Sequence, residues 1–592
     1  MRDVIVIGCG GGGPVIAKEL AQRGLDVLVL EAGARHANPE EAWTHFDNDQ
    51  NNVIDGEFRF GPEDRDRSAW LREAPQNSFV YQVAGVGGTT LHFYGNCPRA
   101  FPGTFDGYSE ADAAAYDVAH RFPFTYESFE PYYRWVEATL PVMTNAMGTK
   151  EEVFFRGCEN VGLPVNPNKD IRFDSFRPQE NCILQPEGTA GRTRDSALLM
   201  YPQAQGCTFC GYCFQGCYEP RRAPRNLKAK RSTDNSYVPM MLTADLWAAG
   251  GKAVTLETDA YVTRIVSETT AAGDVSARAV TWRNTKTGTV YTEEAQVIVM
   301  AGGCTEDPRL WKNSQLPDPN QWVGRGMTDH AFDWLTGVFP SYTGHSKGPN
   351  SAARADFPGR GAMEQVGLTP ALQTLAMHIS DSGMRGLYDA GRGVTGTWDG
   401  KSGRPVGREL KEVMDNIDRL MNILILTDDD VESVNRAELS ILPPDEHGPI
   451  PRVVMNKRTR SARTLANREW LANKAGEILR AAGATKVIRI DMAPLILHIQ
   501  SSMRMGGDPA SSVLDESCEA RWVKRLFIAD NAALPNALGG ANPTLSTQAL
   551  ATRTAEKILQ TYFGGSPWVE AETPISSIDD RVTQAVLSRG IT

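Results

Sequence analysis

A glycine-rich turn close to the N-terminus constrains the fold of this chain more than any other feature. The buried-strand pattern DVIVI is followed by Gly8, Gly10 and Gly13 in the spacing G-x-G-x-x-G. Residues 14–23 then predict a helix, and residues 26–31 (DVLVLE) predict a second strand. Strand, glycine turn, helix and strand in this order predict a parallel βαβ unit at the start of an α/β fold.

Each glycine of this turn has a separate task in a dinucleotide site. The first allows a tight turn, the second lets the backbone approach a pyrophosphate, and the third lets the helix pack on the strand. Phosphates then meet the unpaired N–H groups of the helix N-terminus. Glu31 ends the second strand, where a carboxylate accepts a hydrogen bond from a ribose hydroxyl. We therefore predict dinucleotide binding, with a purely structural glycine turn as the alternative.

Length, charge and hydropathy limit what the rest of the chain does. Its 592 residues are enough for three or four domain-sized units, and 41% of them are hydrophobic. The net charge of −11 gives no basic field that would attract nucleic acid or anionic lipid. No apolar run is long enough to span a membrane, and the N-terminus has no export signal. We expect a cytoplasmic protein; export together with a signal-bearing partner is the alternative.

Further along, several segments have clear patterns. Residues 253–299 predict antiparallel strands with a hairpin turn at NTKTG, and residues 297–303 and 526–535 each predict a strand that ends in a turn. Residues 459–483 and 541–559 predict helices. Residues 340–405 are weakly patterned, and the tail beyond 563 is polar and expected to be loose.

Four of the ten cysteines lie within eleven residues, at Cys207, Cys210, Cys213 and Cys217. Their spacing, C-x₂-C-x₂-C-x₃-C, is that of bacterial iron–sulfur runs, except that Tyr218 replaces the usual proline. The pattern favours an iron–sulfur cluster; structural cysteines, a closed zinc site and disulfides are the alternatives. A basic segment, residues 221–231 (RRAPRNLKAKR), follows. It predicts a solvated loop or, beside the cysteines, a docking patch for an acidic electron-transfer partner.

Three separated blocks resemble the glucose–methanol–choline (GMC) oxidoreductases, which are FAD enzymes. The first is the glycine turn with Glu31-Ala-Gly, and the second is the glycine-rich segment 85–90 (GVGGTT). The third is the C-terminal pair 498–506 (HIQSSMRMG) and 540–544 (GANPT). Together with residues 323–330 (VGRGMTDH) they follow the family order along nearly the whole chain.

The resemblance implies an α/β fold in which a doubly wound FAD-binding Rossmann-type domain is interleaved with a substrate domain made of a sheet and helices. We expect the FAD-binding domain at 1–102, 197–330 and 490–565, and the substrate domain at 103–196 and 331–489. We expect the cysteine loop at 207–217 and the C-terminal tail at 566–592.

The resemblance also implies which residues contact FAD. Besides the N-terminal glycines and Glu31, they are Gly87, Gly88, Thr89, Thr90, His92, Val262, Asp530, Asn542 and Pro543. In the pyranose-oxidase branch of the family, a histidine in the position similar to His92 is covalently bound to the flavin. For His92 we keep three alternatives open: a covalent link, an unlinked flavin-facing side chain and a structural side chain.

At the reacting end, hydride transfer to a flavin requires a base within hydrogen-bond reach of the substrate hydroxyl. His498 follows the apolar run APLIL; periodicity alone favours a structural histidine, but the resemblance implies the catalytic base. Asn542 matches the second catalytic position, where an amide binds the substrate oxygen or holds the histidine. The alternative for Asn542 is an N-cap of the helix that follows it, and both roles are compatible.

The resemblance extends to the cysteines. FAD sugar dehydrogenases of the family carry a three-iron cluster on three cysteines with the spacings of Cys207, Cys213 and Cys217; with Cys210 as a fourth ligand, a four-iron cluster is the alternative. We expect an FAD-dependent dehydrogenase that oxidises a secondary alcohol on a sugar, glycoside or polyol. Its electrons are expected to pass through the cluster to a cytochrome-type acceptor, and a small subunit is a further expected partner. The alternatives are an oxygen-using oxidase of the same fold and a non-catalytic flavin electron-transfer subunit.

Overall fold

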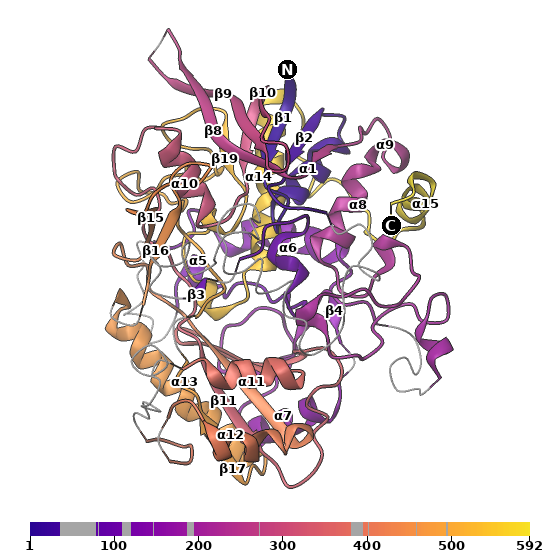
Figure 1. Cartoon of the computed structure of the whole chain (residues 1–592), viewed down its shortest axis with the longest axis vertical. Coiled ribbons are helices and arrows are strands. Elements are labelled where there is room, and N and C mark those ends of the chain that lie inside the picture. The colour runs from indigo at the N-terminus through magenta and orange to yellow at the C-terminus, as the bar shows by residue number, and fades with distance from the viewer. Residues whose placement is uncertain are drawn as a thin grey trace.

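The computed structural model of the chain has two main regions, which lie one above the other in Figure 1. It describes all of the chain apart from four longer gaps and several gaps of one or two residues. The described residues are 1–35, 79–80, 82–108, 120–145, 147–185, 195–271, 273–380, 395–400, 402–456, 459–492 and 495–591. Within them no helix is long and apolar enough to cross a membrane.

The upper region is built on a seven-stranded sheet in which the N-terminal strand is central. β1 (Arg2–Ile7) pairs in parallel with β2 (Val27–Leu30) on one side and with β10 (Val290–Met300) on the other. β7 (Thr255–Glu257) extends the sheet beyond β2, and β19 (Leu526–Ile528) pairs in parallel with β10. Strands from both ends of the chain therefore share one sheet, as the doubly wound α/β prediction requires.

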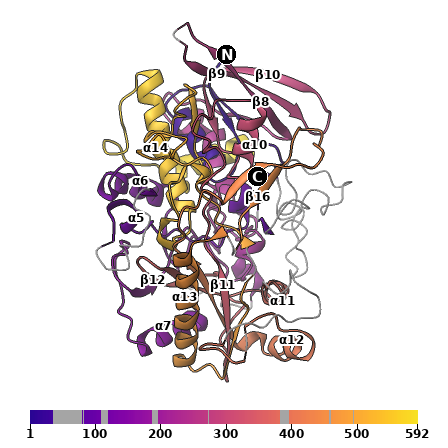
Figure 2. The ribbon, with the colours of Figure 1, turned by 90° about the vertical axis from the view of Figure 1, so that its left-hand side faces the viewer.

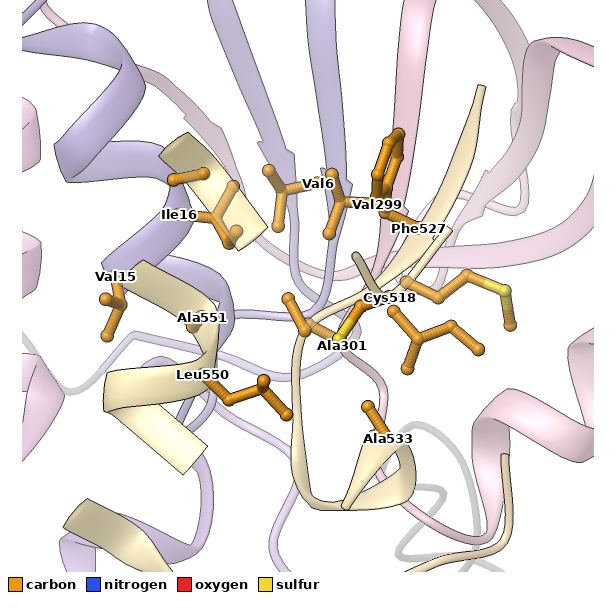
Figure 3. Packing of buried hydrophobic residues seen from close by; sticks show 14 of the residues in the cluster. Val6, Val15, Ile16, Val299, Ala301, Cys518, Phe527, Ala533, Leu550 and Ala551 are labelled. Carbon is orange, nitrogen blue, oxygen red and sulfur yellow. The ribbon is translucent and has the colours of Figure 1, made fainter. Parts of the chain in front are cut away.

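Two helices cover one face of this sheet, and Figure 3 shows the packing between them. Val15 and Ile16 of α1 (Gly13–Ala21) and Leu550 of α14 (Thr544–Phe563) are fully buried in the same apolar cluster as Val6 of the central strand. α1 begins directly at the glycine turn, so its N-terminus lies at the carboxyl end of β1. Ligands of open parallel sheets bind at this edge.

The predicted meander after residue 253 is confirmed. β8 (Ala260–Thr269), β9 (Val275–Asn284) and β10 pair antiparallel in sequence order, with the NTKTG turn between the last two. The long β10 serves both layers: its first half pairs with β9 and its second half with β1. It ends at the glycine turn 301–303.

The lower region is built on a six-stranded antiparallel sheet with the order β17-β11-β14-β13-β12-β5. In that order the strands are Lys486–Arg489, Asp333–Val338, Leu420–Thr427, Gly361–Val366, Ala353–Phe357 and Ser175–Pro178. The long helix α13 (Ala462–Ala481) and α7 (Thr149–Asn160) pack on one face, and α11 (Pro370–His378) and α12 (Gly407–Met414) contribute to the apolar cluster on the other (Figure 2). This is the sheet-plus-helices arrangement expected of the second domain; the domain boundaries themselves stay a prediction.

Residues 340–405 looked weakly patterned, yet they contain β12, β13 and α11. All eleven residues of the two strands are buried. Strands buried on both faces lose the alternation of apolar and polar residues that identifies a half-buried strand. Charged residues inside them, such as Arg354 and Glu364, obscure the pattern further.

The expectation of a loose C-terminal tail was wrong. Trp568 is buried, with the guanidinium of Arg23 stacked on its ring at 3.6 Å. α15 (Asp580–Arg589) packs near α8 (Tyr237–Leu242) and α9 (Ala244–Trp247). The polar composition of the tail concealed a few apolar side chains that anchor it on the first domain.

The remaining elements are shorter. The other α-helices of the described residues are α5 (Gly103–Asp106), α6 (Tyr126–Thr139) and α10 (Glu306–Asn313). Three pairs of short strands lie outside the two main sheets: β3 (Phe79–Val80) with β18 (Leu495–Ile496), β4 (Met143–Thr144) with β6 (Glu180–Asn181), and β15 (Arg436–Leu439) with β16 (Pro451–Val454).

Candidate active site

A long cleft opens at the carboxyl ends of β1, β2 and β10. It consists of two adjoining cavities, which share lining residues that include Gly10, Gly88 and Gly302. One cavity extends along β2 toward Glu31 and Val262. The other extends toward the second sheet, where His498, Asn542 and Glu364 line it. The shape fits an elongated ligand whose middle lies over the glycine turn.

The glycine turn has the geometry of a pyrophosphate cradle. A Cβ on Gly8 would lie 2.3 Å from the carbonyl oxygen of Ala301, and one on Gly13 would lie 2.1 Å from that of Gly8. Both positions therefore require glycine for internal packing. At Gly10 the nearest atom to such a Cβ is 3.8 Å away, so the protein itself tolerates a side chain there. Gly10 lines both cavities, which is the arrangement expected if its space belongs to a ligand.

A second glycine-rich segment approaches the first. Gly87, in a left-handed conformation with φ of 104°, donates its N–H to the carbonyl of Cys9 at 2.8 Å. The next residue, Gly88, comes so close that a Cβ would lie 2.7 Å from Cα of Gly10. Gly88, Thr89 and Thr90 line the cleft, and Gly87 forms the turn that precedes them. Thr90 is fixed by its hydroxyl, which donates to the carbonyl of Gly87 at 2.5 Å.

Glu31 lies at the far end of the cleft. Its carboxylate accepts hydrogen bonds from the N–H groups of Cys9 at 2.7 Å and Gly33 at 2.8 Å. Burial raises its pKa to about 7, and these backbone donors oppose the rise. Val262 lines the same cavity, as expected of a residue beside the cofactor.

Asp530 lines the cleft on its other side, just after β19. It accepts from the N–H groups of Gly303 at 2.6 Å and Ala532 at 2.7 Å, and it shares a hydrogen bond with the buried carboxyl of Asp307. Burial and the neighbouring Asp530 together raise the pKa of Asp307, so one proton is held between the two acids. Pro543 lines the same cavity.

His498 follows β18 and reaches the second cavity. Its backbone N–H donates to the buried carboxylate of Asp329 at 2.7 Å, and its ring Nδ1 lies 3.0 Å from Nδ1 of His330. Burial lowers the pKa of His498 to about 3, so the ring is neutral near pH 7. A neutral imidazole in a cavity is the form that accepts a proton.

The partner of His498 determines which of its nitrogens is basic. His330 is completely buried, and its Nε2 lies 3.2 Å from the carbonyl oxygen of Ala537. A carbonyl only accepts, so Nε2 of His330 carries the hydrogen. Burial keeps His330 neutral by lowering its pKa, which leaves its Nδ1 without a proton. His498 must then donate from Nδ1, and its Nε2 is the unprotonated nitrogen.

Asn542 lies beside this pair, but it is not a helix cap. The N-cap of α14 is Pro543, and no side chain caps that end. The amide of Asn542 instead lies within hydrogen-bonding reach of the buried carboxylate of Glu364 and helps to hold its pKa down. The capping interpretation was therefore wrong, while the position of Asn542 beside His498 in the cavity fits the family pattern.

Two residues of this site, Glu364 and His330, were not predicted from the sequence to have a role. Glu364 belongs to a strand that was not predicted, and its neighbours in space lie far away along the chain. His330 was part of the quoted segment VGRGMTDH, and that segment was the available signal for it. Its contact with His498 joins residues 168 positions apart, which no local pattern reports.

The cysteine loop adjoins the same cavity. Phe214, next to Cys213, lines the cavity, and its carbonyl lies 3.0 Å from Nδ1 of His92. The ammonium group of Lys230 donates to the carbonyls of Leu91 and Phe93 at 2.8 Å and of Cys213 at 2.5 Å. The loop and the glycine-rich segment are thus joined at two places. His92 itself lines the cavity.

The four clustered cysteines line one small cavity of their own. Burial raises the pKa of the thiols of Cys207, Cys210 and Cys213. Among the described residues, however, no group of three or more His, Cys, Asp or Glu side chains is placed to hold a metal ion. A zinc ion needs its ligands within about 2.3 Å of one point. The arrangement thus does not fit a single zinc ion, and no disulfide joins these cysteines.

The basic segment was expected to be solvated or to form a docking patch, and most of it does neither. Its buried members are Arg225, Lys228, Lys230 and Arg231. Arg225 forms an ion pair with Asp234 at 2.5 Å, and Arg231 binds backbone carbonyls and the hydroxyl of Ser577 in the tail. Only Arg221 and Arg222 are exposed. The segment is an internal brace between the cysteine loop, the glycine-rich segment and the tail.

Comparison with known proteins agrees with this geometry. Two family models described as GMC oxidoreductase match residues 198–332 and 447–551. Three similar proteins are paromamine 6'-oxidase of Streptomyces fradiae, the fructose dehydrogenase large subunit of Gluconobacter japonicus and 2-methyl-1,2-propanediol dehydrogenase of Mycolicibacterium austroafricanum. Each is 24% identical to this chain. The alignments cover 94%, 94% and 95% of the chain and 91%, 97% and 95% of the three relatives.

Proposed function

Because this chain belongs to the GMC oxidoreductases, an FAD-binding family that oxidises alcohols and sugars, we propose that it is a dehydrogenase of a secondary alcohol on a sugar, glycoside or polyol. When bound, FAD supplies the two-electron acceptor that takes the hydride of the alcohol. The observation that carries the proposal is the neutral imidazole of His498, held in one tautomer inside the cavity at the end of a dinucleotide-shaped cleft.

Different residues of the chain bind the cofactor and transfer the proton. Gly10, Gly88 and Asp530 accommodate the pyrophosphate and the chain that leads to the flavin, and Glu31 holds the ribose. His498 accepts the hydroxyl proton at Nε2 as the C–H bond breaks. His330 stays hydrogen-bonded to Nδ1 of His498 throughout, so the ring keeps its orientation while it becomes charged. A non-catalytic electron-transfer subunit would have no need of such a base.

For electron exit we propose an iron–sulfur cluster held by Cys207, Cys213 and Cys217, with Cys210 as a fourth ligand if the cluster has four irons. A cluster spreads its ligands around a core larger than one ion, which suits four thiols lining a common cavity. The direct contacts of this loop with His92 and with the cavity through Phe214 support a role next to the flavin. When bound, a cluster carries electrons singly to an acceptor such as a cytochrome.

A second candidate is an oxidase of the same fold, in which oxygen is the acceptor and the cysteines are structural. It is favoured by several relatives that are named oxidases and align with nearly the whole chain, paromamine 6'-oxidase among them.

One set of measurements separates the two candidates. The purified protein is assayed for flavin, iron and acid-labile sulfide, and is then mixed with sugars and polyols without oxygen. Bleaching of the flavin band by an alcohol supports alcohol oxidation, and its absence with every alcohol contradicts it. Iron and sulfide with slow oxygen consumption support the dehydrogenase. A protein free of iron that produces hydrogen peroxide at each turnover supports the oxidase.

A further inference from the structure

Asp307 and Asp530 are two buried carboxyl groups that are hydrogen-bonded to each other in the middle part of the cleft. Asp307, in the first turn of α10, lines the cavity that contains Glu31, whereas Asp530 lines the cavity that contains His498. Gly302 lines both cavities and donates its N–H to Oδ1 of Asp307 at 3.0 Å. The pair therefore lies where the two cavities adjoin, and no step described so far uses Asp307.

The hydrogen-bond partners show which of the two acids carries the shared proton. Both oxygens of Asp530 accept from backbone N–H groups, Oδ2 from Gly303 at 2.6 Å and Oδ1 from Ala532 at 2.7 Å. Asp307 accepts one such bond at Oδ1, and its Oδ2 is buried and receives no N–H or O–H donor from the described residues. An ionised oxygen in this position costs free energy, whereas a protonated one becomes a donor. Asp307 is therefore the protonated acid, and it donates to Asp530.

The charges around Asp307 favour the same assignment. Burial, and after it the charge of Asp530, raises the pKa of Asp307, and Glu306 adds to the rise. The N–H of Gly302 opposes the rise, and the N-terminus of α10 favours a negative charge at this position as well. Burial and the two neighbouring acids outweigh both, because the pKa of Asp307 lies well above its ordinary value.

The cleft as a whole is acidic, although its shape fits a dinucleotide. The described residues that line its two cavities include five acids and one arginine but no lysine: Glu31, Glu306, Asp307, Glu364, Asp530 and Arg309. Arg309 forms an ion pair with Glu306, and the buried thiol of Cys304, whose pKa is raised by burial, donates to the carbonyl of Ile499 at 3.1 Å. The pyrophosphate of FAD is an anion, so each proton that these acids retain lowers its repulsion from the cleft.

We propose that Asp307 is a positioning residue for FAD that acts as a neutral acid: it donates its hydrogen to Asp530, and this shared proton allows the acidic cleft to hold the pyrophosphate. FAD and the proton then bind together. When the proton leaves, a second negative charge appears where the two cavities adjoin, and FAD is released. The inference concerns cofactor binding alone and needs neither the alcohol substrate nor the electron acceptor of the proposed function.

Infrared spectroscopy tests whether Asp307 is neutral. The C=O stretching band of a neutral carboxyl group is separate from the bands of amides and carboxylates. The spectrum of FAD-containing Asp307→Asn is subtracted from that of the FAD-containing protein with Asp307 in place. We expect the difference to contain a neutral carboxyl band that the variant lacks. A carboxylate band in its place would refute the proposal.

The second measurement follows FAD binding as the pH rises. The FAD-containing protein is diluted at pH values from about 6 to about 10, and flavin fluorescence gives the Kd of FAD. While the pair keeps its proton, the Kd should not change; above the pKa of Asp307 it should rise by up to about tenfold per pH unit. The amide of Asp307→Asn stays a neutral donor, so this variant should bind FAD within about threefold of wild type at low pH and show no rise.

Two outcomes of this titration would overturn the proposal. An equal rise of the Kd in wild type and Asp307→Asn would show that another group controls the release of FAD. A constant wild-type Kd over a pH range in which the infrared band of Asp307 disappears would show that FAD binding does not depend on this proton. A band and a Kd that change at the same pH support the proposal.

Variants of the neighbouring acids serve as controls. Glu306→Gln removes an acid that lines the same cavity and raises the pKa of Asp307, so it should keep the rise of the Kd and displace it to lower pH. Glu31 is the competing group, because burial raises its pKa to about 7. If the rise disappears in Glu31→Gln and persists in Asp307→Asn, the controlling proton belongs to Glu31 and the proposal is wrong. All titrations use a His92→Ala background, in which no covalent bond to this side chain retains the flavin.

Discussion

Two substitutions of His330 distinguish a role in fixing the tautomer of His498 from a role in packing. His330 makes one hydrogen bond through each ring nitrogen, to Nδ1 of His498 at 3.0 Å and to the carbonyl of Ala537 at 3.2 Å. The amide of asparagine occupies the region of Nδ1, so His330→Asn keeps an acceptor for His498. The longer glutamine reaches the region of Nε2, so His330→Gln keeps the bond to Ala537 and leaves His498 without its acceptor.

The two variants have similar costs in stability but different costs in rate. Each orphans one buried group, which lowers the free energy of unfolding by about 1–3 kcal/mol. A general base contributes about 10²- to 10⁴-fold to rate, and an imidazole that loses its fixed tautomer forfeits part of this. We expect His330→Gln to reduce flavin about 10- to 100-fold more slowly than wild type, and His330→Asn to stay within about fivefold.

The assay is rapid anaerobic mixing of the FAD-containing variants with the best alcohol substrate, followed by the flavin absorbance. Denaturant unfolding on the same preparations establishes that the two variants are comparably stable. Equal rates in the two variants would refute the tautomer argument, because each retains a hydrogen-bonded amide in the same buried site. If His330→Asn reduced flavin more slowly than His330→Gln, the hydrogen bond to Ala537 would be the one that determines the rate.

The other predictions concern the base, the cradle, the cysteines and pH. His498→Ala should retain FAD and slow flavin reduction by about 10²- to 10⁴-fold; near-native rates would remove His498 from the mechanism. Gly10→Ala should fold with unchanged stability, because its Cβ has room, yet lose FAD on purification, whereas a fully yellow preparation would contradict the cradle. Cys213→Ser should lower iron and sulfide content but leave single-turnover flavin reduction intact; unchanged iron, or loss of both, would count against the cluster. Because burial lowers the pKa of His498 to about 3, the ring stays neutral and able to accept a proton well below pH 6.5. The rate of flavin reduction should therefore not fall as the pH drops through 6.5, and a fall there that disappears in His498→Ala would contradict the buried neutral ring.

Local patterns were sufficient for those parts of the fold in which one short segment carries its own geometry. The strand, turn and helix around Gly8 and Gly13 follow from steric demands that act within about six residues, and the structure forms them as predicted. The hairpin at NTKTG is similar, because its turn residues determine the conformation. The strand β19 also followed from its own pattern, and the resemblance assigned it, together with the residues around His498, to the first domain.

Patterns failed where charge was buried. Lys230 and Arg231 look like surface residues in the sequence, yet the structure encloses both and satisfies their N–H groups with backbone carbonyls. Burial lowers the pKa of Lys230 to about 8, while the neighbouring thiols raise it. Composition shows how much charge a segment has. The hydrogen-bond partners that stabilise a buried charge come from other parts of the chain, so composition does not reveal them.

The same limit applies inside the candidate site, and there it affects the chemistry. A motif identifies His498 and Asn542 as residue types, but an imidazole has two nitrogens and an amide has two ends. Which nitrogen is basic follows from His330, and the amide of Asn542 lies within hydrogen-bonding reach of Glu364. Both partners are completely buried and therefore hold one arrangement. The basic nitrogen of His498 is therefore set by a residue 168 positions away, and no local pattern connects the two.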